Sequence, residues 1–418
     1  MTTYPWARVA THARQLASIR SLRRKTDALH KDADALPYIG LNPYSLALDY
    51  LDLQSATSPQ VVLVVPDARQ NAMFAGTRTA IKAAVEAATL TGRPLRIVSF
   101  AALSSTERQR CSELVDSEFE FGQPLIIDDL RTVSNAPCSS GDIWIATYYT
   151  TAHCLQLLAD RQRIDRSKVI YLIQDHEPTF FPASTSAALA SATYQAGFVP
   201  LVNTNVLAQT LQKREGVDIP PQHVFSAELD YGRLAGTASR RDSAERDRIL
   251  FYGRPAKPRN MFDLGLCALR LAARKIEDSG LGPVEFVSIG AKVPQSRLTT
   301  MSSLKSSGRL EWARYFDMLA TGRVMLSLQA TPHPSHPPLD MIVSGGHAVT
   351  NEIEGVRAGL HPRLHAVTAD PTDLADAIVA ALRESKSKGP GPYDDTIREK
   401  LGRPFQDAVA SAVRATTP

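Results

Sequence analysis

A cluster of polar residues that can hold and move protons stands at the end of an apolar run. The run VIYLI, residues 169–173, is followed directly by Gln174, Asp175, His176 and Glu177. Carboxylates and imidazoles serve as general bases near neutral pH, and charged groups often form sites at the carboxyl ends of buried strands. We therefore take Asp175, His176 and Glu177 as candidate catalytic residues. The alternative is an ion-paired loop with a structural histidine.

In a second stretch, basic residues directly follow an expected strand. Ile249–Tyr252 is followed by Gly253, Arg254 and Arg259, and a helix is expected from about Met261. A glycine lets a ligand approach the backbone closely, and guanidinium groups form paired hydrogen bonds with phosphate oxygens. The loop is therefore a candidate diphosphate site, with a solvated basic loop as the alternative.

A third stretch, GRVMLSLQATPHPSHPPLDMIVSGGHAVTNE, predicts a strand, a loop, a short helix and another strand. The helix is expected over Leu339–Ser344, with Asp340 in its first turn, where it would accept two hydroxyls of a ribose. Free N–H groups at a helix start, next to a strand's carboxyl end, commonly bind phosphorylated ligands. The candidate binding residues of this stretch are His333, Ser335, His336 and Asp340.

Weaker signals mark the ends of other expected strands in the first half of the chain. These candidates for an acceptor side are Gly76, Thr147, Gln174 and Asn203. Asn203 has an equally good alternative as the N-cap of a helix. Nothing else in this half identifies an acceptor.

Strands alternate with helices along most of the chain, which predicts an α/β protein with two Rossmann-like domains. We expect an N-terminal domain over residues 1–235, with a basic helix at 1–35, and a C-terminal domain over 248–393. The polar stretch 236–247 is interpreted as a linker between them. A single final helix is expected within 394–418. Asp370 is expected to cap a helix whose buried face carries Leu374, Ile378 and Leu382.

Composition limits the class of protein. Lys plus Arg number 47 and Asp plus Glu 43, so the net charge of +4 gives no argument for nucleic acid. No apolar run is long enough to cross a bilayer, and the N-terminus lacks a signal-peptide core. The four cysteines have no metal or redox spacing and predict reduced, mostly buried thiols in a cytoplasmic protein. The basic helix at 1–35 either packs on its domain or touches anionic lipid at the cytoplasmic membrane face.

The three motifs together resemble those of GT-B glycosyltransferases, above all the bacterial rhamnosyltransferases that use dTDP-L-rhamnose to build S-layer glycans and O-antigens. PHPSHPPLDMIVSGGHAVTN is similar to their donor-sugar motif, and QDHEP is similar to a Gln-Asp-aromatic-Glu-Pro motif of the family. Two departures stand out. Asp340 replaces the usual glutamate, and Pro332 stands where many relatives carry another glutamate, so the contact of that glutamate is either absent or replaced by His333.

The resemblance implies a GT-B fold, with two Rossmann-like domains facing each other across a cleft and a final helix that crosses back to the N-terminal domain. It implies transfer of L-rhamnose from dTDP-L-rhamnose, bound by the C-terminal domain, to a saccharide or lipid-linked glycan. Arg309, which matches a basic residue of the family, would neutralise the departing diphosphate, so no metal or other cofactor is expected. Open alternatives are a UDP- or GDP-sugar donor, a nucleotide-sugar epimerase, and a non-catalytic nucleotide-sugar-binding partner.

Overall fold

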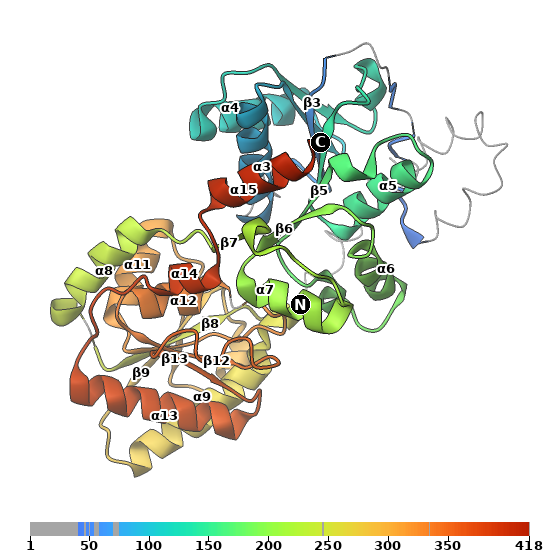
Figure 1. Cartoon of the computed structure of the whole chain (residues 1–418). Coiled ribbons are helices and arrows are strands. Elements are labelled where there is room, and N and C mark those ends of the chain that lie inside the picture. Colours follow the sequence, from blue (N-terminus) through green and yellow to red (C-terminus); the bar gives the residue numbers. More distant parts are fainter. Residues whose placement is uncertain are drawn as a thin grey trace. The chain divides into compact units, whose positions relative to one another are not determined.

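The computed structural model describes residues 41–45, 47–49, 51–53, 58–69, 75–244, 246–333 and 335–417. The helix expected over residues 1–35 lies outside these ranges. The chain forms two compact units, shown in Figure 1. The first unit reaches Asn203 and also contains Glu215–Phe225 and the chain from Pro404, whereas the second contains Thr204–Arg214 and Ser226–Arg403.

Seven parallel strands make the sheet of the first unit, in the order β3-β2-β1-β4-β5-β6-β7. They are β1 (Val61–Val65), β2 (Leu95–Ser99), β3 (Leu125–Asp129), β4 (Ile143–Ala146), β5 (Val169–Ile173), β6 (Val199–Asn203) and β7 (Val224–Phe225). Every residue of β1 is buried, as expected for an apolar strand covered on both faces. The strand order reverses between β1 and β4, which creates a switch point at the carboxyl edge of the sheet.

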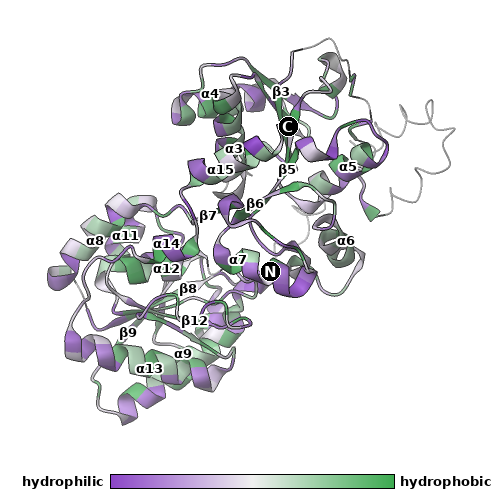
Figure 2. Cartoon of the chain, viewed as in Figure 1, coloured by the Kyte–Doolittle hydropathy of each residue, from purple (hydrophilic) through white to green (hydrophobic). Residues whose placement is uncertain are grey.

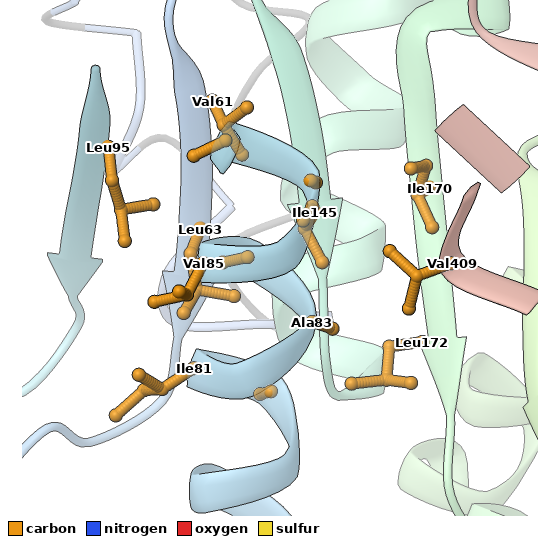
Figure 3. Close-up of a cluster of buried hydrophobic side chains, with 14 of the residues drawn as sticks. Val61, Leu63, Ile81, Ala83, Val85, Leu95, Ile145, Ile170, Leu172 and Val409 are labelled. Atoms are coloured by element: carbon orange, nitrogen blue, oxygen red, sulfur yellow. The ribbon is translucent and has the colours of Figure 1, made fainter. Parts of the chain in front are cut away.

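Helices cover this sheet with their apolar faces. They are α3 (Ala75–Thr91), α4 (Ser105–Phe119), α5 (Tyr149–Asp160), α6 (Thr185–Thr193) and α15 (Phe405–Ala415). Figure 3 shows Ile81 and Val85 of α3 lying over the strands beside Leu63. Val409 of α15 belongs to the same hydrophobic cluster, so the end of the chain completes the core of the first unit.

The second unit has a six-stranded parallel sheet, in the order β10-β9-β8-β11-β12-β13. Its strands are β8 (Arg248–Gly253), β9 (Glu285–Gly290), β10 (Leu304–Gly308), β11 (Val324–Leu326), β12 (His347–Asn351) and β13 (Leu364–Val367). Here the order reverses between β8 and β11. These two strands precede the basic loop and the proline-rich loop, so both loops start at the switch point.

Two groups of helices enclose the second sheet. One hydrophobic cluster contains α9 (Phe262–Asp278) and α13 (Pro371–Lys388). Another contains α8 (Tyr231–Ala244), α11 (Trp312–Thr321), α12 (His336–Val343) and the short helix α14 (Ile397–Leu401). Green and purple patches alternate along α13 in Figure 2, as expected for a helix with one buried face.

The prediction for α13 is confirmed in detail. Asp370 is its N-cap, and the Asp370 carboxylate accepts the backbone N–H of Thr372 at 2.7 Å. Leu374, Ile378 and Leu382 are fully buried. The prediction for the cysteines also agrees, since three of the four are buried and all are free thiols.

Two predictions about the connections are wrong. The stretch 236–247 is not an open linker, because most of it belongs to α8, where Thr237 and Arg241 are fully buried. Arg241 fixes the helix by donating to the Gly322 carbonyl at 2.7 Å. The final helix is not continuous either: α14 ends before Gly402, whose φ is 151°, and α15 begins after Pro404.

Helices and strands that are short or mostly polar are not predicted by the hydrophobic pattern of the sequence. α6 is built mainly from Ala, Ser and Thr, β7 has two residues, and β10 has the weakly strand-forming sequence LKSSG. None of the helices in the described residues is long and apolar enough to cross a membrane.

Candidate functional site

The basic loop after β8 is packed closely onto the second sheet. A Cβ atom on Gly253 would lie 2.7 Å from the Ser288 Oγ and 3.0 Å from the Phe262 ring, so a larger residue would force these side chains to shift. Arg254 and Arg259 are half-buried. The carbonyl of Arg254 accepts the backbone N–H three residues later at 2.9 Å, which folds the basic loop into a turn.

The loops after β8 and β11 are tied together. The Ala330 N–H donates to the Arg259 carbonyl at 2.7 Å. The buried Asn260 side chain donates to the Gln329 Oε1 at 2.9 Å and to the Leu328 carbonyl at 3.3 Å. The predicted phosphate-binding loop and the proline-rich loop are therefore one hydrogen-bonded structure at the switch point, where α/β sheets bind ligands.

A fully buried arginine, Arg357, organises the proline-rich loop from behind. Its guanidinium donates to the Asn351 carbonyl at 2.6 Å, to the Gln329 carbonyl at 3.2 Å and also to the Thr331 carbonyl. The Asn351 side chain is part of the same network, because its Nδ2 donates to the Gln329 carbonyl at 3.0 Å. Arg357 thus uses the five N–H donors of a guanidinium to satisfy carbonyls that the irregular loop leaves without helix or sheet partners.

The two loop histidines are neutral hydrogen-bonding groups. Burial, with the nearby His336 and Arg357, lowers the pKa of His333 to about 3. The His333 Nδ1 accepts the Ser335 N–H at 3.1 Å, so the proton of the neutral ring is on Nε2. Burial also lowers the pKa of His336, and the two ring centroids are 6.4 Å apart. Both imidazoles can therefore donate an N–H to an anion without adding charge.

Helix α12 begins three residues earlier than predicted, at His336. Pro337 and Pro338 lie in its first turn, where the fixed φ of proline suits a helix and its missing N–H is not needed. Ser335 precedes the helix with φ 70° and ψ 162°, a conformation that costs a non-glycine residue on the order of 1–3 kcal/mol. The loop holds this strained residue directly before the free N–H groups of α12, and such strain often marks a binding site.

Because α12 starts early, Asp340 lies in its second turn. The Asp340 side chain is buried, and one of its carboxylate oxygens already accepts a hydrogen bond. Tyr315 of α11 donates its hydroxyl to the Asp340 Oδ2 at 2.8 Å. Burial raises the pKa of Asp340 to about 7, although the Tyr315 hydrogen bond works in the opposite direction. Asp340 is therefore half-ionised near neutral pH, a property that its place in the sequence does not predict.

Arg309 lies at the same edge of the sheet but is exposed. It follows Gly308, the last residue of β10, and that strand is separated from β8 by β9. The binding candidates of the second unit thus all lie at or beyond carboxyl ends of its parallel strands.

The first unit brings its acceptor-side candidates to the equivalent edge. The Gln174 Nε2, after β5, donates to the Gly76 carbonyl at 2.9 Å. Thr147, after β4, donates its hydroxyl to the Val64 carbonyl of β1 at 3.2 Å, across the switch point. Asn203 is the last residue of β6, and α7 (Asn205–Glu215) starts two residues later. These candidates follow parallel strands and share one edge of one sheet.

The three catalytic candidates differ in exposure. Glu177 is 3% exposed, and its Oε2 accepts the Tyr149 N–H at 2.7 Å, at the start of α5. Burial raises the pKa of Glu177 well above its ordinary value. His176 is also 3% exposed, and its Nε2 lies 2.6 Å from the Glu215 carboxylate. Asp175 alone of the three is only half-buried, and its Oδ1 accepts the His176 N–H at 2.9 Å.

Sequence reasoning misses the residues that support these candidates. Arg357, Tyr315 and Glu215 lie 24 to 39 positions away along the chain from His333, Asp340 and His176, which they contact. An arginine in the loop after β12 and a carboxylate at a helix end are ordinary in sequence. Of the three, only Tyr315 could have been found from the sequence, because it lies in an amphipathic helix that closely follows the candidate Arg309.

Comparisons with known proteins agree with this architecture. The N-terminal domain model of WsaF matches residues 60–205, and the C-terminal domain model of WsaF matches residues 247–379. The O-antigen biosynthesis protein RfbC of Myxococcus xanthus is 32% identical over 244 residues, which are 57% of this chain and 18% of RfbC. The chain therefore spans less than a fifth of the length of this curated relative.

Solved structures share the fold at low sequence identity. HepE of Anabaena, in complex with UDP-glucose, has a TM-score of 0.52 at 12% identity and covers 85% of this chain and 95% of its own. Sucrose-phosphate synthase of Thermosynechococcus elongatus has a TM-score of 0.50 at 12% identity, covering 85% and 94%. The predicted fold class is confirmed, and the chain, which matches the models of both WsaF domains, belongs to the WsaF family.

Proposed function

We propose that this chain transfers a deoxyhexose, L-rhamnose, from dTDP-L-rhamnose to a saccharide acceptor in the synthesis of a surface polysaccharide. The observation that carries the proposal is the pair of loops at the β8/β11 switch point, where cationic side chains, neutral histidines and a helix start converge. The matches to both WsaF domains and to a protein of O-antigen biosynthesis support the process. A lipid-linked glycan at the cytoplasmic membrane face is the acceptor that fits this process.

The second unit would bind the donor. Arg254 and Arg259 would hold the diphosphate together with the N–H groups that begin α12, because guanidinium groups and helix starts both favour phosphate. The loop histidines would donate neutral N–H groups to phosphate or sugar oxygens. Asp340, held by Tyr315, would accept ribose hydroxyls. Arg309 would neutralise the charge that develops on the departing diphosphate, a role that elsewhere falls to a metal ion.

The first unit would bind the acceptor and supply the base. Among the three candidates Asp175 is the best base, since it alone is partly exposed. His176 and Glu177 are better explained as positioning residues, because the Glu215 carboxylate and the start of α5 already engage their side chains. The acceptor side would be lined at the same sheet edge by Gly76, Thr147, Gln174 and Asn203.

A UDP-sugar is the alternative donor, because HepE, which shares the fold, was solved with UDP-glucose. A thermal-shift panel of dTDP-rhamnose, UDP-glucose and GDP-mannose tests the donor directly. A ligand that binds only the native state stabilises it by about 2.7 kcal/mol at a hundredfold excess over Kd. The proposal expects the largest rise in Tm with dTDP-rhamnose, and a larger rise with UDP-glucose would overturn the donor assignment.

Product analysis completes the test. Arg254→Ala should reduce the dTDP-rhamnose shift, whereas Arg240→Ala should keep it, since Arg240 is exposed on α8 and pairs with Asp317 at 2.6 Å. Incubation with donor alone should leave the sugar unchanged, and an acceptor glycan should be needed for turnover. Conversion of the donor sugar without acceptor would instead indicate an epimerase, and binding without any turnover would indicate a non-catalytic partner.

A further inference from the structure

Three side chains of types that bind metal ions meet near the amino ends of two strands of the second sheet, away from the loops that follow β8 and β11. His347 is the first residue of β12, His365 lies in β13, and Glu384 lies in the last part of α13. One ligand atom from each lies within 4.8 Å of the other two, and this is the one such group of three in the described ranges. The three residues come from separate elements, so their spacing in sequence gives no metal signature.

The distances suit a metal ion. The His347 Nδ1 and the His365 Nε2 are 3.1 Å apart. Two nitrogen ligands of one tetrahedral zinc ion, each about 2.0–2.1 Å from it, are about 3.3 Å apart. The two rings are nearly parallel, with an interplanar angle of 22°. Side-chain rotations that open the direct contact between the two nitrogens would turn both of them, and the Glu384 carboxylate, toward one ion.

Charges near the three side chains matter as well. Histidine binds a metal ion as the neutral imidazole, and glutamate binds it as the carboxylate. Two cations, Arg363 and Lys388, lie near enough to His347 to oppose a bound ion. Lys388 pairs with Glu384 at 2.8 Å, but its side chain is 73% exposed and can turn into solvent.

We propose that His347, His365 and Glu384 form a binding site for a divalent transition-metal ion, with Zn²⁺ as the best fit. Two imidazoles and one carboxylate favour zinc over Mg²⁺ or Ca²⁺, which prefer oxygen ligands. The ion would connect β12, β13 and α13 near the amino ends of the strands, whereas the loops after β8 and β11 follow the carboxyl ends. Its role is therefore to stabilise this unit, and it takes no part in sugar transfer. The site stands independently of the proposed function.

Cobalt binding by the full chain tests the site. The protein is stripped with EDTA, desalted and titrated with CoCl₂, whose visible absorption reports nitrogen ligands in a tetrahedral site, and then with ZnCl₂ to displace the cobalt. We expect one equivalent of Co²⁺ to bind at this site and zinc to replace it. Absence of any such absorption in the wild-type chain would overturn the proposal.

Variants assign the signal to these residues. His365→Gln and Glu384→Gln should each weaken Co²⁺ binding by at least about tenfold. His153→Gln, which removes a buried histidine of the first unit, should leave it unchanged. The Glu384 side chain is 37% exposed, so that variant remains informative if His365→Gln folds poorly. Cobalt affinity that is equal in the wild type and Glu384→Gln would overturn the site.

A variant that should bind Co²⁺ more tightly than the wild type gives the most specific test of the site. Lys388→Ala removes a positive charge and frees the Glu384 carboxylate, so Co²⁺ should bind more tightly than in the wild type. Arg383→Ala is the matched control, because it removes one exposed cation from α13 and keeps the ion pair between Lys388 and Glu384. Weaker binding in Lys388→Ala than in Arg383→Ala would contradict the arrangement of ligands.

Discussion

The ionisation of Asp340 should make donor binding depend on pH. The carboxyl group is 4% exposed, and its pKa is raised by burial to about 7. Only the ionised form can accept hydrogen bonds with both of its oxygens while donating none. For a pKa of about 7, the ionised fraction rises from roughly 0.1 at pH 6 to about 0.9 at pH 8. Donor affinity should therefore rise about tenfold over this interval.

The free protein should show the opposite trend in stability. The folded-state pKa of Asp340 lies above its unfolded value, so this group's stabilising contribution is complete below about pH 4 and is lost as the pH rises through 7. Integration between pH 6 and pH 8 gives a loss on the order of 1 kcal/mol in the free energy of unfolding. Donor binding, which favours the ionised form, should offset this loss and release a proton.

Isothermal titration calorimetry with dTDP-rhamnose at pH 6, 7 and 8 measures both effects. The sugar nucleotide is preferable to dTDP, because a terminal phosphate has its own pKa near 6. Repeating the titration in buffers of different ionisation enthalpy counts the released protons. Asp340→Asn should bind more weakly than the wild type at pH 8 and should lose the pH dependence.

Tyr315→Phe separates the hydrogen bond from the carboxylate itself. Loss of the 2.8 Å bond from the Tyr315 hydroxyl should raise the pKa of Asp340 further, and the tenfold rise in affinity should move to higher pH. Tyr393→Phe is the matched control, since its hydroxyl bonds to Asp395 in the same unit, and it should keep the wild-type profile. A donor affinity that is flat from pH 6 to pH 8 in the wild type would refute the role given to Asp340.

Four further results are expected. Arg254→Ala and Arg309→Ala should each weaken dTDP binding by about 1.5–3 kcal/mol, measured by calorimetry, and wild-type affinity in both would contradict the phosphate assignment. Asp175→Asn should lower transfer by about 10²–10⁴ with dTDP affinity unchanged, whereas Glu177→Gln should retain most transfer; normal turnover in Asp175→Asn would remove the proposed base. Transfer should persist in EDTA, so full loss that Mg²⁺ or Mn²⁺ restores would reveal a catalytic metal. Arg357→Met should lower the Tm and donor affinity together, because the loop carbonyls lose a buried donor, and an unchanged Tm would show that the network is dispensable.

Much of the fold is predictable from the sequence, because the strands are apolar runs and the helices have one apolar face. Val61–Val65 is a short, continuous run of mostly β-branched residues, which indicates a buried strand. The helix Pro371–Lys388 has its buried apolar residues at helical spacing. The edge strand Leu304–Gly308 is not predictable in this way, since its sequence is mostly polar. The helix Tyr231–Ala244 resembles a linker because its buried side includes Arg241, a residue type that pattern reasoning assigns to solvent.

The positions of site residues can be predicted where a sequence motif contains them. Their ionisation cannot be predicted where it depends on burial in the folded chain. The positions of Gly253 and His333 follow from strand ends, which the apolar runs mark. The ionisation of Asp340 depends on burial and on a tyrosine from another helix, and neither can be deduced from neighbouring residues. The same limit applies to the base. Asp175 and Glu177 are equivalent in sequence, yet folding leaves one partly exposed and places the other against the backbone of α5.

Arg357 shows why the donor loop needs support from outside its own motif. A loop rich in proline has few backbone N–H groups and several carbonyls, so it cannot satisfy itself by turns or by a sheet. Five carbonyls converge on the guanidinium of Arg357, those of Gln329, Thr331, Pro332, His333 and Asn351. The buried positive charge also helps to keep His333 neutral. A neutral His333 is a donor whose state does not change in the physiological pH range. The pH response of donor binding then rests on Asp340, which makes the tenfold change a specific consequence of this arrangement.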